Sequence, residues 1–132
     1  LFPYTTLFRS IADAQSPYAG GLMQLTPVTA QEYGAKLGLS SFNYMDPETN
    51  IQIGCFLLRS LIDKYGGEVD TALAAYNGGP ANVDIWLSDP ACSSDGKKLN
   101  IIPFKETSEY VEKVNNYMQE YKKTGSLEQK EE

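Results

Sequence analysis

Histidine is absent from this chain of 132 residues, and its absence excludes several classes of site at once. A chain without histidine has no Ser-His-Asp triad, no imidazole general base and no histidine-ligated metal. Basic residues are also scarce, because 11 Lys and Arg stand against 17 Asp and Glu, a net charge of −6. Phosphate binding needs clustered positive charge, so nucleic acid is not an expected partner.

Long apolar runs are lacking, and there are only two cysteines. No run approaches the roughly 18–20 apolar residues that a membrane-spanning helix needs, so no transmembrane segment is expected. Cys55 falls on an apolar helical face, where we expect it to act as a small core residue, and Cys92 falls in a polar loop. A disulfide between them stays open, because sequence alone does not establish its geometry.

What is present predicts one all-α globular domain. The chain is 42% apolar and 21% charged, which is ordinary for a folded protein of this length. No convincing alternation of period two predicts a strand. Helix signals instead follow one another along the sequence, and residues 88–103 between the last two helices read as a loop. The predicted helices are 27–36, 47–65, 71–77, 80–86 and 108–122.

The starts and faces of these helices have local causes. Thr26-Pro27 and Asp46-Pro47 each combine a capping side chain with a proline at the first helical position, and Asp70 is predicted to cap the third helix. The second helix carries one apolar stripe at helical spacing, which should face the core. That stripe consists of Ile51, Cys55, Leu58, Ile62 and Tyr65.

Four short sequence islands, in a fixed order, carry the functional signal. They are Gly-Leu-Met-Gln-Leu at 21–25, Asp-Pro-Glu-Thr-Asn-Ile at 46–51, Ala-Tyr-Asn-Gly-Gly-Pro at 75–80, and Glu-Thr with Tyr-Val at 106–111. Together they resemble the lysozyme-like domain of the soluble lytic transglycosylases, which cut the glycan strands of bacterial peptidoglycan. The resemblance runs from about Ile11 to Tyr121. It implies a lysozyme-like helical domain over residues 11–123 that is incomplete at its N-terminus. The polar composition of residues 124–132 predicts a disordered tail.

The first island has a chemistry that suits an amino sugar. Gln24 offers an amide donor and an acceptor, which match the two polar groups of an N-acetyl substituent. Gly20 and Gly21 give the backbone freedom to turn tightly or to approach a ligand closely. In the resembled family the matching Met and Gln border the sugar beside the scissile bond, so Met23 and Gln24 are expected to bind substrate. Read alone, the segment would more often be a core-forming helix start.

The later islands supply further candidates by the same resemblance. Tyr76 and Asn77 are expected to line the glycan cleft, where a tyrosine face can stack on a pyranose ring. Tyr110 corresponds to a cleft tyrosine, and Glu106 is interpreted as a support for the cleft. In isolation, Tyr76 would be a buried tyrosine and Asn77 an asparagine at the C-terminal end of a helix. Glu106 would be a favourable charge at a helix N-terminus. Glu48 occupies the corresponding place in another helix and reads as structural.

The expected catalytic residue is missing. In the resembled family a glutamate precedes the first island by a turn and a loop, which here falls near Thr6 or Leu7, and residues 1–10 contain no Asp or Glu. That segment resembles the translation of a sequencing-library adapter. We interpret it as a non-native segment in place of the original N-terminus. The alternative is an unusual natural N-terminus.

The resemblance implies a peptidoglycan lytic transglycosylase that needs no cofactor or metal. Such an enzyme uses one glutamate and forms a 1,6-anhydro product at the MurNAc-GlcNAc β-1,4 bond. Such an enzyme would be a monomer that acts on glycan strands in the cell envelope. This chain, without the glutamate, would bind glycan weakly and cut nothing. The alternatives are a goose-type lysozyme-like hydrolase, a noncatalytic peptidoglycan-binding or scaffold domain, and a helical interaction domain without a cleft.

Overall fold

The computed structural model describes residues 19–131, and the side chains of residues 19–125. Thr6, Leu7 and the rest of segment 1–10 lie outside this range. The described chain is all-α, as the sequence predicts, with one isolated antiparallel bridge between Gly20 and Leu25. The helices are α2 (Pro27–Lys36), α3 (Pro47–Lys64), α4 (Val69–Gly78), α5 (Pro80–Ser88) and α6 (Lys105–Glu131).

The predicted starts of α2 and α3 are confirmed by their capping geometry. The Thr26 side chain accepts a hydrogen bond from the Thr29 amide, and the Asp46 side chain accepts one from the Thr49 amide. Each cap is followed by proline, whose missing N–H costs nothing at the first helical position. The cap predicted at Asp70 is wrong, because α4 begins at Val69 and Asp70 lies inside its first turn.

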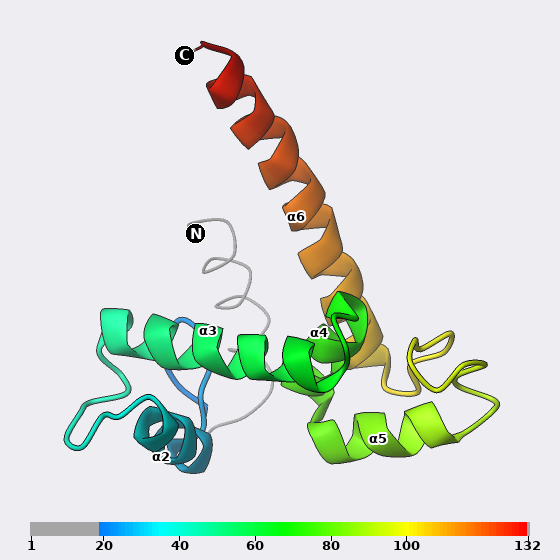
Figure 1. Cartoon of the computed structure of the whole chain (residues 1–132), viewed down its shortest axis with the longest axis horizontal. Coiled ribbons are helices and arrows are strands. Elements are labelled where there is room, and N and C mark those ends of the chain that lie inside the picture. The colour runs from blue at the N-terminus through cyan, green and yellow to red at the C-terminus, as the bar shows by residue number, and fades with distance from the viewer. Residues whose placement is uncertain (1–18, 132) are drawn as a thin grey trace.

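Helix α4 is the central element. It packs against α3, α5 and α6, while α2 packs against α3. In Figure 1, α2 lies beside α3, α5 follows the turn after α4, and α6 extends away from the other helices. The predicted apolar character of α4 explains its position, because five consecutive residues from Thr71 to Ala75 are buried. Three of these five residues are alanines, whose small side chains let neighbouring helices approach the α4 backbone closely.

Helix α3 turns a different face to the core from the one the sequence predicts. Its buried apolar residues are Ile53, Leu57 and Leu61. Cys55 is exposed, so its predicted role as a core residue is wrong, and the other members of the predicted stripe are only partly buried. Cys92 lies in the predicted loop but is itself buried, and both cysteines are free thiols.

Helix α6 also differs from its prediction at both ends. It begins at Lys105, and it continues to Glu131 through the segment predicted to be a disordered tail. Residues 127–131 of this stretch are Leu, Glu, Gln, Lys and Glu, which have high helix propensity. Once a helix exists, each further residue adds a hydrogen bond without a new nucleation cost, so the helix can continue without tertiary contacts.

A polar tether joins α3 to α5 and allows a stability prediction. Lys64 Nζ lies 2.9 Å from Asp84 Oδ2, and the Tyr65 hydroxyl donates to Asp84 Oδ1 at 2.9 Å. The Lys64 hydrogen bond lowers the pKa of the Asp84 carboxyl. A lowered folded-state pKa means that the stabilisation is present at neutral pH and is lost as the pH falls through the acidic range.

We therefore expect Asp84→Asn to lower the free energy of unfolding at pH 7 by less than about 1 kcal/mol, because both partners are roughly half exposed. Thermal unfolding at pH 7 and at about pH 3 should show the difference from wild type shrinking at the lower pH, where the carboxyl is protonated. Asp63→Asn, which removes a partner of the exposed Arg59 within one helix, is the matched control. A difference that persists unchanged at low pH would contradict this account.

Candidate functional site

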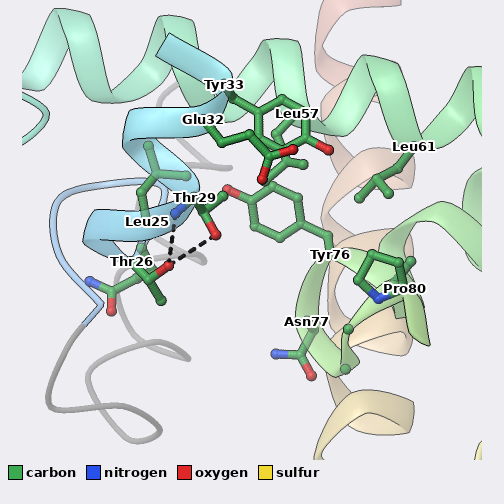
Figure 2. A pocket seen from close by; sticks show the side chains of 14 residues that line it. Leu25, Thr26, Thr29, Glu32, Tyr33, Leu57, Leu61, Tyr76, Asn77 and Pro80 are labelled. Atoms are coloured by element: carbon green, nitrogen blue, oxygen red, sulfur yellow. Dashed lines mark hydrogen bonds between the residues drawn. The ribbon is translucent and has the colours of Figure 1, made fainter. Parts of the chain in front are cut away.

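A groove of about 450 Å³ opens between α2, α3 and the C-terminal end of α4. One wall comes from α2 and the turn before it, the floor from α3, and the other wall from residues 75–80 (Figure 2). The lining residues are Gln24, Leu25, Thr26, Thr29, Glu32, Tyr33, Leu57, Leu61, Ala75, Tyr76, Asn77, Gly78, Gly79 and Pro80. Three of the six predicted binding residues, from two distant islands, therefore line one cavity.

Gln24 lies in a tight turn at one end of the groove. Gly20 and Leu25 exchange both backbone hydrogen bonds, each 2.9 Å long, and this closes the turn. Gln24 has a φ of 50°, an uncommon conformation for a residue with a side chain. Its Nε2 donates to the Gly21 carbonyl at 2.9 Å. This bond fixes the side chain, and no described residue donates to its amide oxygen, which can therefore accept from a ligand.

Met23 is buried in the core and is not among the described lining residues of the groove. Only 4% of its surface is exposed, and it packs against Gly54 of α3, where a Cβ would lie 2.5 Å from Met23 Cβ. The Met23 carbonyl accepts a hydrogen bond of 2.6 Å from the Tyr76 hydroxyl. The two islands that the sequence predicts to meet at the groove are thus joined directly.

Tyr76 presents its ring to the groove. Figure 2 shows the ring between the end of α4 and the α2 wall, with Glu32 and Tyr33 beside it. Because its hydroxyl donates to the Met23 carbonyl, the ring face is the part best suited to contact a sugar. Burial raises the pKa of the Tyr76 hydroxyl, so it stays protonated and keeps donating at any physiological pH.

Asn77 is held by the last helix. Thr107, which is 2% exposed, donates from Oγ1 to Asn77 Oδ1 at 2.8 Å. Gly78 makes this approach possible, because a Cβ there would lie 2.9 Å from Thr107 Oγ1. The Glu-Thr pair at 106–107 therefore contributes to the groove through Thr107, a structural role that sequence reasoning did not assign to it.

Glu106 and Tyr110 do not belong to the described lining of this groove. Glu106 is exposed in the first turn of α6, and Tyr110 is 3% exposed in the core. Burial raises the pKa of the Tyr110 hydroxyl. Their roles in substrate binding stay predictions, whereas Gln24, Tyr76 and Asn77 are brought together in the structure.

The α2 wall was missed by sequence reasoning. Thr29, Glu32 and Tyr33 line the groove from one face of this helix. Their spacing of three and four residues is the signal that could have identified them as neighbours. The Tyr33 ring is fixed from two sides, by an edge-on contact with Phe56 at 6.2 Å and by the Lys36 ammonium 4.4 Å from its centroid.

Glu32 is the one carboxylate among the described residues that line the groove, and its environment does not suit a general acid. It forms a salt bridge of 2.9 Å with Lys36, and its side chain is 55% exposed. A carboxyl that remains protonated near neutral pH needs an apolar enclosure without a cationic neighbour. Glu48 and Glu106 are exposed and lie outside the described lining.

No described helix is both long and apolar enough to cross a bilayer. Between residues 19 and 131, no group of three or more Cys, Asp or Glu side chains is arranged to hold a metal ion.

Known proteins with similar sequences are transglycosylases. The chain is 36% identical over 104 residues to the soluble lytic murein transglycosylase of Escherichia coli K12, and this match covers 75% of the chain but 16% of that protein. It is 49% identical over 61 residues to a transglycosylase of Enterobacteria phage PRD1, covering 46% of the chain and 20% of the phage protein. The chain thus spans about one sixth to one fifth of these relatives.

A solved structure gives the same relationship in three dimensions. The X-ray structure of an inactive mutant of the lytic transglycosylase Slt from Pseudomonas aeruginosa matches with a TM-score of 0.69 and 34% sequence identity. The match covers 88% of this chain and 20% of that protein, and it supports the predicted lysozyme-like helical fold. The family model described as the transglycosylase SLT domain matches residues 9–98. The chain therefore belongs to the transglycosylase SLT domain family.

Proposed function

We propose that this chain is the glycan-binding part of a peptidoglycan lytic transglycosylase, which cleaves the MurNAc-GlcNAc β-1,4 bond and leaves a 1,6-anhydro end. The observation that carries the proposal is the meeting of Gln24, Tyr76 and Asn77 at one groove in a domain of this family. The Escherichia coli relative is named a soluble lytic murein transglycosylase, and murein is the substrate class that these polar and aromatic groups suit.

The groove offers the contacts that an N-acetylated sugar needs. The Gln24 amide oxygen can accept from the N–H of an N-acetyl group, and the Tyr76 ring can lie against the apolar face of a pyranose. Thr29 and Glu32 on the opposite wall can bond to sugar hydroxyls. Aromatic and aliphatic side chains with a few placed polar groups are typical of ligand sites.

The cleavage itself requires an enclosed carboxylic acid. A glutamate would first protonate the glycosidic oxygen, and the carboxylate so formed would then accept the proton of the sugar's own C6 hydroxyl as that oxygen attacks the anomeric carbon. The glutamate-to-glutamine substitution in the Pseudomonas mutant, described as inactive, agrees with such a role. In this chain the expected position falls at Thr6 or Leu7, outside the described residues, and segment 1–10 has no carboxylate.

The proposed place of action follows from the substrate. Peptidoglycan lies in the cell envelope, so we propose a periplasmic or extracellular site of action at the cell wall, with the glycan strand as the partner of a monomeric domain. One observation favours the alternative of a noncatalytic peptidoglycan-binding domain. Glu32, the carboxylate among the described lining residues of the groove, is exposed and paired with Lys36.

Binding to a soluble glycan tests the proposal. We expect Gln24→Ala to weaken the affinity for the β-1,4-linked tetramer of N-acetylglucosamine by roughly 5- to 150-fold, because an unpaired polar group in a complex costs about 1–3 kcal/mol. Titration followed by NMR would give the dissociation constants. Gln31→Ala, which removes an exposed amide from α2, is the matched control. Equal binding by wild type and Gln24→Ala would refute the groove assignment.

A further inference from the structure

Asn50, in the fourth position of α3, is a buried amide that bonds to three backbone groups outside its own helix. Its surface is 0% exposed, and its side-chain oxygen accepts from the Met23 amide at 2.7 Å. Its Nδ2 donates to the carbonyls of Gly20 at 3.1 Å and of Tyr44 at 2.8 Å. A buried amide has one acceptor and two donor hydrogens, and here all three functions have backbone partners.

Two of these three partners belong to the turn that carries Gln24. Asn50 holds the Gly20 carbonyl at the start of the turn and the Met23 amide immediately before Gln24. Between them, Gly21 has a φ of 78°, and a Cβ there would collide with the Asn50 amide. The turn is therefore folded directly around this side chain, and the absence of a Cβ at Gly21 allows the approach.

The unusual backbone of Gln24 needs such external support. A residue with a side chain at a φ of 50° is held there by its surroundings, since the left-handed region costs a non-glycine residue on the order of 1–2 kcal/mol. The supports are the Asn50 bond to the preceding amide, the Tyr76 bond to the preceding carbonyl, and the Gln24 side-chain bond to Gly21. Asn50 is the one support that comes from α3.

Helix α3 is a rigid base for this contact. It is 18 residues long and is capped by Asp46. The backbone N–H of Asn50 donates to the Asp46 carbonyl at 2.8 Å. Because the Asn50 backbone is fixed in this helix, its side-chain bonds hold residues 20–24 at a fixed position relative to α3. Leu57 and Leu61 of the same helix line the groove, so Asn50 ties the turn that carries Gln24 to the helix that forms the groove floor.

We infer that Asn50 is a positioning residue of the groove, which acts on the ligand through Gln24 without touching it. The inference rests on the proposed function of the groove. Loss of the three amide bonds should release Met23 and Gln24 together, so that the Gln24 amide no longer meets an N-acetyl group in the required orientation. Displacement of a binding group by about 1 Å is enough to reduce function strongly.

The test is a double-mutant cycle with Asn50→Asp and Gln24→Ala. Asn50→Asp keeps the shape of the side chain but replaces the two N–H donors with an acceptor that faces two carbonyl oxygens. We expect each single variant to weaken binding of the N-acetylglucosamine tetramer by roughly tenfold, and the double variant to be at most about twofold weaker than either single variant. Multiplied losses, or unchanged affinity in Asn50→Asp, would overturn the inference.

Thr71→Val provides the matched control for stability. Thr71 is 1% exposed and donates to the Lys97 carbonyl at 2.8 Å, so this variant also loses a buried hydrogen bond, but away from the described groove lining. It should bind the tetramer within about twofold of wild type at a temperature where all variants are folded. If Asn50→Asp does not fold, Asn50→Ser takes its place. Failure of both to fold overturns the inference, because Asn50 would then serve the whole fold.

Hydrogen exchange gives a readout that does not need a ligand. The amides of Gly20 and Leu25 bond to each other's carbonyls, and we expect Asn50→Asp to accelerate their exchange at least tenfold relative to Thr71→Val. Equal exchange in the two variants would also overturn the inference. If wild type binds no tetramer while exchange responds as expected, the proposed function fails, but Asn50 still holds the turn at Gly20 and Leu25 in place.

Discussion

Replacing residues 1–10 by a helical segment that carries a glutamate at position 6 or 7 should convert the chain into an enzyme that cleaves peptidoglycan. The corresponding segment of the Escherichia coli relative is a suitable donor, given 36% identity over the matched region. Protonation of the leaving group by a placed acid contributes about 10²–10⁴-fold to the rate, and binding groups alone cannot replace it. We expect the ungrafted chain to show no cleavage above background.

Product analysis of purified peptidoglycan digests checks this expectation. The same graft with glutamine in place of glutamate is the control, and it should be inactive. Muropeptides with 1,6-anhydro ends support the transglycosylase, whereas reducing ends would identify the goose-type hydrolase. If the ungrafted chain already lyses peptidoglycan at a rate comparable to the graft, another carboxylate is the acid. Glu48 and Glu106 are then the candidates from sequence, and Glu32 is the candidate from the groove.

The helices could be predicted well because their signals are local. A capping side chain and the proline after it act within four residues, so Thr26 and Asp46 locate the starts of α2 and α3 without knowledge of the rest of the fold. The end of α6 was not predictable in the same way. Its continuation beyond Lys122 depends on propagation of a helix that the rest of the domain has already nucleated.

The rotation of α3 about its axis could not be predicted from its apolar pattern. Ile51, Leu58 and Ile62 form one apolar stripe, and Ile53, Leu57 and Leu61 form a second one next to it. The periodicity is equally satisfied by either. The choice is made by tertiary contacts: Gly54 admits Met23, and Asn50 binds the turn at Gly20. This places Cys55 at the surface.

Those residues of the candidate site that stand in unusual sequence patterns could be predicted. Gln24, Tyr76 and Asn77 stand in islands whose glycines and polar groups are not explained by helix formation alone, and the structure brings them together. Tyr110 has the same kind of signal, but a tyrosine on an apolar helical face can equally belong to the core, where it lies. The two partners of Asn50 in the turn that carries Gln24 are 27 and 30 residues away, and no local rule reveals them.

The contact between Gly21 and Asn50 leads to the largest expected effect on stability. Gly21→Ala introduces a side chain at a φ of 78°, and its Cβ would collide with the fully buried Asn50 amide. The strain of the left-handed backbone is on the order of 1–2 kcal/mol. Displacing Asn50 adds the cost of buried amide and carbonyl groups that lose their partners, about 1–3 kcal/mol for each such group. We expect a loss of about 3–5 kcal/mol in the free energy of unfolding.

Gly38→Ala separates the two causes. Gly38 has a φ of 86°, close to that of Gly21, but a Cβ there would meet no atom within 4 Å. This variant should therefore lose only the backbone contribution, about 1–2 kcal/mol. Urea unfolding of both variants gives the difference between them, which measures the packing of Gly21 against Asn50. If Gly21→Ala costs no more than Gly38→Ala, the turn can move away from α3 freely. Asn50 would then not fix the position of Gln24, so this comparison tests the same contact from its other side.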